Sequence, residues 1–236
     1  MAEFGKGLPD KCGPLPSVPM NRSNALLPTA IFCLFISGAA GLVYQVAWMR
    51  YLSLFLGHTS YAVVAVLVSF MGGLALGNAW LGARADRIRR PLAFYAWLEI
   101  GIAIYAVVFP YFFDWCDEAY VGLTRSWQPG GAGLLGLKFA FSLLTIFLPT
   151  VLMGGTLPVM AKLVTRSLGE LKDRVSTLYF VNSLGAVVGC FLADFWWIPT
   201  IGLQITVLAG AAMNMVAGAI AFFMSGWIKE EQARAN

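Results

Sequence analysis

The chain contains 236 residues, of which 59% are hydrophobic and only 12% are charged, and its mean hydropathy is +0.74. Soluble domains carry about 25% charged residues, so this composition excludes a soluble globular protein and predicts that lipid surrounds most of the chain. The net charge of +4 comes from basic residues beside apolar segments, a placement that sets membrane topology and does not indicate nucleic-acid binding.

Six apolar runs follow a polar N-terminal segment. A membrane-spanning helix needs about 20 apolar residues, and runs of that length lie near 25–56, 60–82, 92–113, 134–165, 175–198 and 203–227. We therefore expect an all-α membrane protein with a flexible tail over 1–24, a six-helix transmembrane domain over 25–228 and a second tail over 229–236. The first segment contains several prolines and no short apolar core, so we do not expect a signal peptide.

The connections between these runs differ in charge, which predicts their side of the membrane. The second connection, the fourth connection and the C-terminal tail are basic, whereas the third connection is acidic. Because Lys and Arg accumulate in cytoplasmic loops, we expect both termini to be cytoplasmic. Asp194, near the outer end of the fifth run, is expected to pair with Arg50 or Lys138.

Two of the runs contain a Gly-x-x-x-Gly pattern, which favours close packing of helices in lipid. Gly73 and Gly77 lie in the second run, Gly185 and Gly189 lie in the fifth, and each glycine is 112 residues from its counterpart. Glycine is common in such helices, but the constant spacing indicates three helices that are repeated once. Since three is odd, the second copy would be inverted in the membrane, as in each half of a major facilitator transporter. We therefore predict a fold that resembles one such half.

The fourth run is interrupted by Pro149, Gly154, Gly155 and Pro158. Proline removes an N–H from the helical ladder, and lipid offers no replacement partner. Irregular backbone at membrane depth is tolerated where it lines a cavity or is covered by protein, and broken helices often mark the cargo site of a transporter. The alternative is a proline kink that only shapes packing.

Four segments in order carry a resemblance to a known family. They occupy 38–50, 70–77, 148–158 and 179–186, and the last contains the pattern Tyr179-x-x-Asn182. Together they resemble the membrane part of fused major-facilitator/spermidine-synthase-like proteins. The family name implies an aminopropyltransferase domain attached to a membrane module. Such a domain needs a nucleotide pocket with a Gly-rich turn and acidic residues, and no polar stretch here is long enough to hold one. We therefore expect a non-catalytic module without a metal or cofactor.

The second connection also resembles a family motif. Its residues Gly82, Asp86, Arg87, Arg89 and Arg90 are similar to the cytoplasmic signature loop of major facilitator proteins, although the glycine that usually precedes the final basic pair is missing. In those proteins the loop ties neighbouring helices together, which implies that Asp86 pairs with a base on an adjacent span. The alternative is an ordinary basic loop.

Four polar side chains within the predicted spans are candidates for substrate binding: Glu99, Asn78, Asn182 and Asn214. An ionisable group at the depth of Glu99 is costly, and by default it suggests a function such as binding a cation or taking a proton. The alternative is a structural hydrogen bond between Glu99 and Asn78 or Asn182. Amide side chains that bridge helices are common packing elements, which is the simpler explanation for the three asparagines.

Three functions are compatible with these features. The first is a transporter-like module that handles a small cation such as a polyamine, as the family name suggests, and that dimerises to complete a pathway. The second is an accessory or scaffold subunit of a larger membrane complex that contacts partner helices, lipids or quinones. The third is a membrane anchor for a separate spermidine-synthase-like enzyme. Each predicts contact with the lipid bilayer, and a bacterial inner membrane is the expected location.

Overall fold

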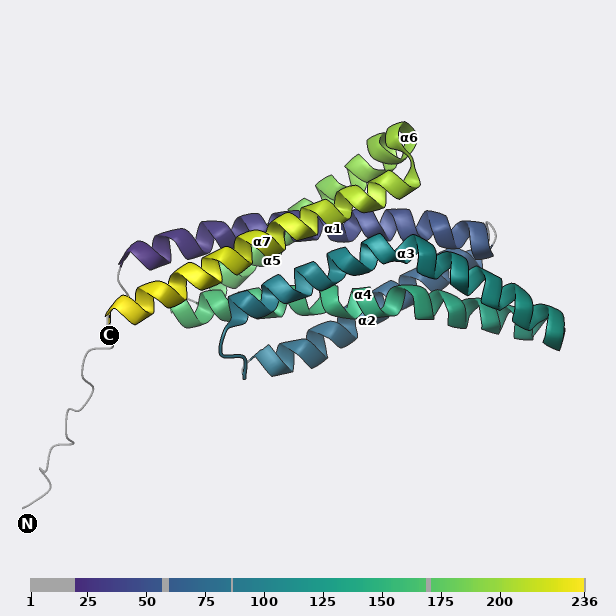
Figure 1. Ribbon diagram of the computed structural model, residues 1–236, viewed down its shortest axis with the longest axis horizontal. Helices are drawn as coiled ribbons and strands as arrows, with labels where there is room; N and C mark the ends of the chain where they lie inside the picture. The colour runs from purple at the N-terminus through teal and green to yellow at the C-terminus, as the bar shows by residue number, and fades with distance from the viewer. Residues whose placement is uncertain (1–19, 57–59, 86, 169–170, 236) are drawn as a thin grey trace, which may run out of the picture.

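The computed structural model describes the backbone of residues 20–56, 60–85, 87–168 and 171–235, and this part of the chain is helical without strands. The elements lie side by side as an elongated bundle (Figure 1). In chain order they are α1 (Met20–Leu56), α2 (Ser60–Ala85), α3 (Pro91–Trp127), α4 (Gly131–Leu168), α5 (Leu171–Leu192), the π-helical turn η1 (Ala193–Trp197), α6 (Ile198–Ile201) and α7 (Leu203–Ala235).

The prediction of six helical segments that are long and apolar enough to cross a membrane is confirmed for the described residues. The stretches long and apolar enough to cross a membrane are Leu26–Phe55, Val63–Ala85, Pro91–Trp127, Gly131–Thr165, Arg174–Ile201 and Leu203–Trp227. The fifth combines α5, η1 and α6. The first turn of α1 and the last turn of α7 lie at the same end of the bundle (Figure 1), as an even number of crossings requires.

The third span is longer than the sequence predicted. We expected it to end near residue 113, but α3 continues to Trp127 and the connection to α4 contains only three residues. The extension stays helical because Cys116 and Tyr120 are buried beside α4, where Tyr120 stacks edge-on against Phe141 at 6.0 Å. Gln128 then ends the helix in a left-handed conformation, with φ 41°.

The predicted break in the fourth span is not observed, since α4 runs without interruption through Pro149 and Pro158. Pro149 leaves the carbonyl of Thr145 without its usual partner four residues along the helix. The hydroxyl of Tyr105 on α3 donates a hydrogen bond to that carbonyl. A side chain from a neighbouring helix thus replaces the lost bond, which lets the helix continue.

Close helix pairs are formed where glycines face backbone. The most extensive contacts join α2 with α4, α1 with α5 and α3 with α7. A Cβ added at Gly77 would lie 2.0 Å from the carbonyl oxygen of Val151 on α4, and one at Gly189 would lie 2.1 Å from that of Ala39 on α1. Such distances are possible only because these positions lack a side chain.

The α2–α4 and α1–α5 pairs also share one register. Gly77 and Gly189 are 112 residues apart, and so are their partners Ala39 and Val151. The same offset relates Gly73, which faces Phe147 as well as Thr150, to Gly185, which faces Phe35. The constant spacing noticed in the sequence therefore corresponds to two equivalent helix contacts.

The fifth span ends in an ion pair. Arg50 at the end of α1 donates a hydrogen bond to Asp194 in η1, with Nη2 2.6 Å from Oδ1. This confirms the predicted pairing of Asp194 with Arg50 in preference to Lys138. The side chains are 56% and 38% exposed, so the pair lies at the surface of the bundle.

Candidate functional site

A cavity of about 380 Å³ lies between α1, α2, α4 and α5. This volume is at the lower end of the range for ligand pockets, about 300–1,000 Å³. Its polar side chains come from all four helices and are Ser37, Asn78, Thr156, Tyr179 and Asn182. The larger apolar side chains are Leu42, Phe70, Leu74, Met153 and Leu157, and the remaining lining residues are small: Gly38, Gly41, Ala75, Gly154 and Ala186.

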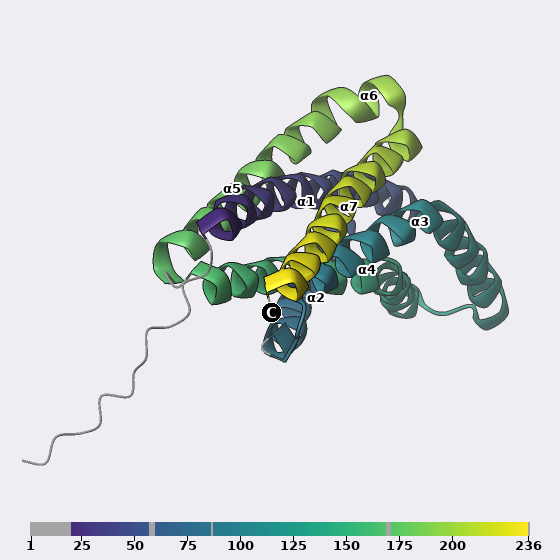
Figure 2. The same ribbon diagram turned by 60° about the vertical axis from the view of Figure 1, so that its left-hand side comes forward.

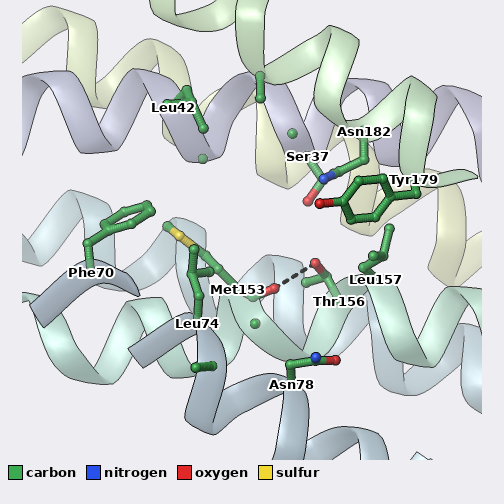
Figure 3. Close-up of a pocket in the computed structure, with 15 residues that line it drawn as sticks. Ser37, Leu42, Phe70, Leu74, Asn78, Met153, Thr156, Leu157, Tyr179 and Asn182 are labelled. Carbon is green, nitrogen blue, oxygen red and sulfur yellow. Dashed lines mark hydrogen bonds between the residues drawn. The ribbon is translucent and has the colours of Figure 1, made fainter. Parts of the chain in front are cut away.

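The polar groups lie on two sides of the cavity. Figure 3 shows the Asn182 amide, the Tyr179 ring and Ser37 on one side, and Asn78 on the opposite side. The backbone of Asn182 lies close to α1 at Gly38. A Cβ added at Gly38 would lie 2.1 Å from the Asn182 carbonyl oxygen, so this approach requires glycine. Thr156 has its hydroxyl committed to the helix, since it donates to the Met153 carbonyl at 2.8 Å (Figure 3).

None of the described residues that line the cavity is charged. Amide and hydroxyl oxygens on the two sides can accept hydrogen bonds, while the apolar residues between them can contact methylene groups. Pro158 also leaves the Gly154 carbonyl without its helical N–H partner, and Gly154 lines the cavity. The arrangement suits a small molecule with hydrogen-bond donors at its ends and an apolar middle.

The four predicted binding residues separate into two sites. Asn78 and Asn182 line the cavity, whereas Glu99 on α3 and Asn214 on α7 contact each other. The Asn214 amide nitrogen donates to Glu99 Oε2 at 2.8 Å, and both side chains are almost fully buried. The alternative explanation for Glu99, a structural hydrogen bond to Asn78 or Asn182, is not observed with these partners, because α3 packs against α7 and Asn214 takes that place.

The residues of the predicted helix break have different positions. Among them only Gly154 lines the cavity. Gly155 faces the side chain of Leu81, and Pro158 lies near Gly82, where a Cβ on the glycine would be 3.4 Å from Pro158 Cβ. The helix packing around these residues, more than an irregular backbone, shapes this wall of the cavity.

The signature-like loop lies away from the cavity lining. Gly82 is near the end of α2, and the side chains of Arg87, Arg89 and Arg90 are exposed between α2 and α3. Asp86 lies outside the described residues, so its expected ion pair stays a prediction.

Sequence reasoning missed three polar residues of the cavity, namely Ser37, Thr156 and Tyr179. A signal for Tyr179 was present, since it precedes Asn182 by three residues and such residues share one face of a helix. Ser37 precedes Gly38 and Thr156 follows Gly155, so both are adjacent to small residues in the sequence. Hydroxyl side chains in membrane helices are too common for this pattern to select them.

Comparison with known proteins gives one distant relationship. The chain is 28% identical over 200 residues to "Polyamine aminopropyltransferase 1" of Streptomyces coelicolor, and the match covers 80% of this chain and 33% of that protein. The chain thus spans about a third of the length of the relative it matches. No protein-family model and no solved structure matches the chain. With six apolar helices, these findings describe a membrane module that is distantly similar to part of a polyamine aminopropyltransferase.

Proposed function

We propose that this chain is a transporter-like membrane module that binds a small amine-bearing molecule of the polyamine class in the cavity between α1, α2, α4 and α5. One observation carries the proposal: Asn78 and Asn182, from separate membrane spans, both line a cavity bounded by two equivalent helix pairs. Amide and hydroxyl oxygens would accept hydrogen bonds from the amino groups, and the apolar side chains would contact the methylene chain. The name of the distant relative supports a polyamine as the ligand.

The proposal includes the arrangement of one half of a major facilitator. The shared register of the α2–α4 and α1–α5 contacts supports a 3+3 inverted repeat. Both termini would be cytoplasmic, as the basic loops predict, and the membrane would be a bacterial inner membrane. Asn78 is exposed on the open side of the cavity. Since a polar group is costly against hydrocarbon, a second copy of the chain would cover that side and complete a pathway.

The proposal also places the chain in the fused major-facilitator/spermidine-synthase-like family as its membrane module. An aminopropyltransferase, on the same protein or on a separate one, would then produce or consume the bound amine beside the membrane. The chain would then also hold such an enzyme at the membrane, and this anchoring role does not require that the chain transports the amine.

An accessory subunit is the second candidate, and a groove favours it. Between α3 and α7 lies an apolar groove of about 370 Å³, lined by aliphatic side chains such as Ile104, Val107, Leu208 and Met215. A lipid chain or the isoprenoid tail of a quinone would fit such a surface without unsatisfied polar groups. Mass determination of the protein taken from its native membrane separates the candidates, since a homodimer supports the two-half pathway and fixed partner proteins support a subunit.

Binding of radiolabelled spermidine to the purified chain in lipid nanodiscs tests the ligand. Asn182→Ala should weaken binding by about tenfold or more, since a hydrogen bond to a charged amine contributes about 1.5–3 kcal/mol. The matched control is Ser183→Ala, which changes the neighbouring residue outside the cavity lining and should leave the affinity unchanged. Absence of saturable spermidine binding to the folded wild-type protein would contradict the proposed ligand.

A further inference from the structure

Glu99 and Asn214 present two buried oxygens that lack partners. The Asn214 amide nitrogen donates to Glu99 Oε2, but Glu99 Oε1 and Asn214 Oδ1 make no hydrogen bond with any described residue. Glu99 is 0% exposed and Asn214 is 1% exposed. Helices α3 and α7 are in close contact here, because Gly218 on α7, one turn beyond Asn214, has no side chain and leaves space beside Glu99 Cβ. A buried polar atom without a partner calls for an explanation, and two such atoms meet in this pair.

The groups around Glu99 provide no described positive charge. Tyr95 from α3, and Cys33 and Tyr44 from α1, are the titratable groups that interact with its carboxyl, and α7 contributes the uncharged Asn214. The Tyr95 hydroxyl is committed to the Cys33 carbonyl, to which it donates at 3.2 Å. The ion pair of Arg50 with Asp194, near the end of α1, does not involve Glu99.

Ser37 connects this pair with the cavity. It lies on α1, lines the cavity on the side of Asn182, and its hydroxyl is also a neighbour of the Glu99 carboxyl. A hydroxyl can accept a proton on one side while it donates its own on the other. Among the described residues, no group of three or more His, Cys, Asp or Glu side chains could hold a metal ion, at Glu99 or elsewhere. A proton, in contrast, needs no cavity of its own.

We propose that Glu99 is a proton-binding site that exchanges its proton with water in the cavity through Ser37. A hydronium ion in the cavity gives a proton to Ser37 Oγ, the hydroxyl proton moves to the Glu99 carboxylate, and water is left in the cavity. The reverse steps release the proton. A bound proton removes the charge that a membrane interior disfavours, and loss of the proton leaves a carboxylate whose only described hydrogen bond comes from Asn214.

Infrared difference spectroscopy on the protein in lipid nanodiscs tests this site without any polyamine, so failure of the proposed ligand does not affect the result. A carbonyl-stretch band of a protonated carboxyl should appear and disappear as pH is changed. Glu99→Gln should abolish the band, whereas Glu118→Gln, which alters an exposed glutamate of the same helix, should keep it. A band that ignores pH, or one that survives in Glu99→Gln, would overturn the proposal.

Two further variants complete the test. One is used if Glu99→Gln does not fold, and the other tests whether the proton passes through Ser37. If Glu99→Gln does not fold, Glu99→Asp keeps an acid and should shift the frequency of the band, while an unshifted band would show that another group carries it. Ser37→Ala should keep the band but slow its exchange in deuterated water by about tenfold or more, a cost of about 1.4 kcal/mol in the barrier. Equal exchange rates in wild type and Ser37→Ala would overturn the route through Ser37.

Discussion

The hydrogen bond between Tyr105 and Thr145 predicts how α4 tolerates Pro149. The Tyr105 hydroxyl donates to the carbonyl that Pro149 cannot reach, and Thr145 is only 1% exposed. Removing the hydroxyl in Tyr105→Phe leaves a buried carbonyl without a donor, which costs about 1–3 kcal/mol. We expect the free energy of unfolding to fall by that amount, measured by SDS titration of the protein in mixed micelles. Tyr111→Phe on the same helix, at a position 71% exposed, should change it by less than about 0.5 kcal/mol.

A second substitution tests the reason directly. Pro149→Ala restores an N–H that can bond to the Thr145 carbonyl, so in the Tyr105→Phe background it should recover most of the lost stability. Loss of the proline ring from its packing is the same in both backgrounds and cancels in the double-mutant cycle. A coupling energy of about 1 kcal/mol or more is expected. Strictly additive effects would refute the idea that Tyr105 compensates for Pro149.

Two other predictions concern contacts between helices of the bundle. Gly77→Ala should lower the free energy of unfolding by about 1–3 kcal/mol, because the new Cβ would lie 2.0 Å from the Val151 carbonyl oxygen. Gly72→Ala in the same helix, where no atom lies within 4 Å of the added Cβ, is the control, and equal SDS-titration curves for the two would contradict the packing argument. Asp194→Asn should cost no more than about 1 kcal/mol, since both partners are partly exposed. A double-mutant cycle with Arg50→Gln should give a coupling that weakens with salt, and a salt-independent coupling would show that the pair is shielded from solvent.

The six spans could be predicted because a membrane-spanning helix requires about 20 consecutive apolar residues, and such runs can be counted along the sequence. The end of the third span could not be predicted in this way, because residues 114–127 form a helix although they include charged side chains. An apolar-run criterion stops at Asp114, yet the helix continues because Cys116 and Tyr120 turn inward while Asp114 and Asp117 remain exposed. Extension past the apolar core depends on a partner helix, here α4, and the sequence does not say which helix that is.

The candidate site was predictable in its residue types and not in their pairing. Polar residues within apolar spans are rare enough to select Glu99 and the three asparagines from the sequence. Which of them meet depends on which helices are neighbours. Glu99 meets Asn214 because α3 packs on α7, and Asn78 shares a cavity with Asn182 because both helix pairs border it.

Among the described residues, the helices pack as two series, α5–α1–α7 and α2–α4–α3, and α3 also packs against α7. The α3–α7 contact is more extensive than the α1–α7 and α3–α4 contacts, whereas α1 and α4 touch far less. Figure 1 shows α7 crossing beside α3, and Figure 2 shows α5 on the side of α1 away from α7. The cavity lies between α1 with α5 on one side and α2 with α4 on the other, and the Glu99–Asn214 pair lies in the α3–α7 contact. Because the Glu99–Asn214 pair lies in the α3–α7 contact, we expect a change at Glu99 to alter how α3 and α7 pack, and α4 and α1 connect this contact with the two walls of the cavity.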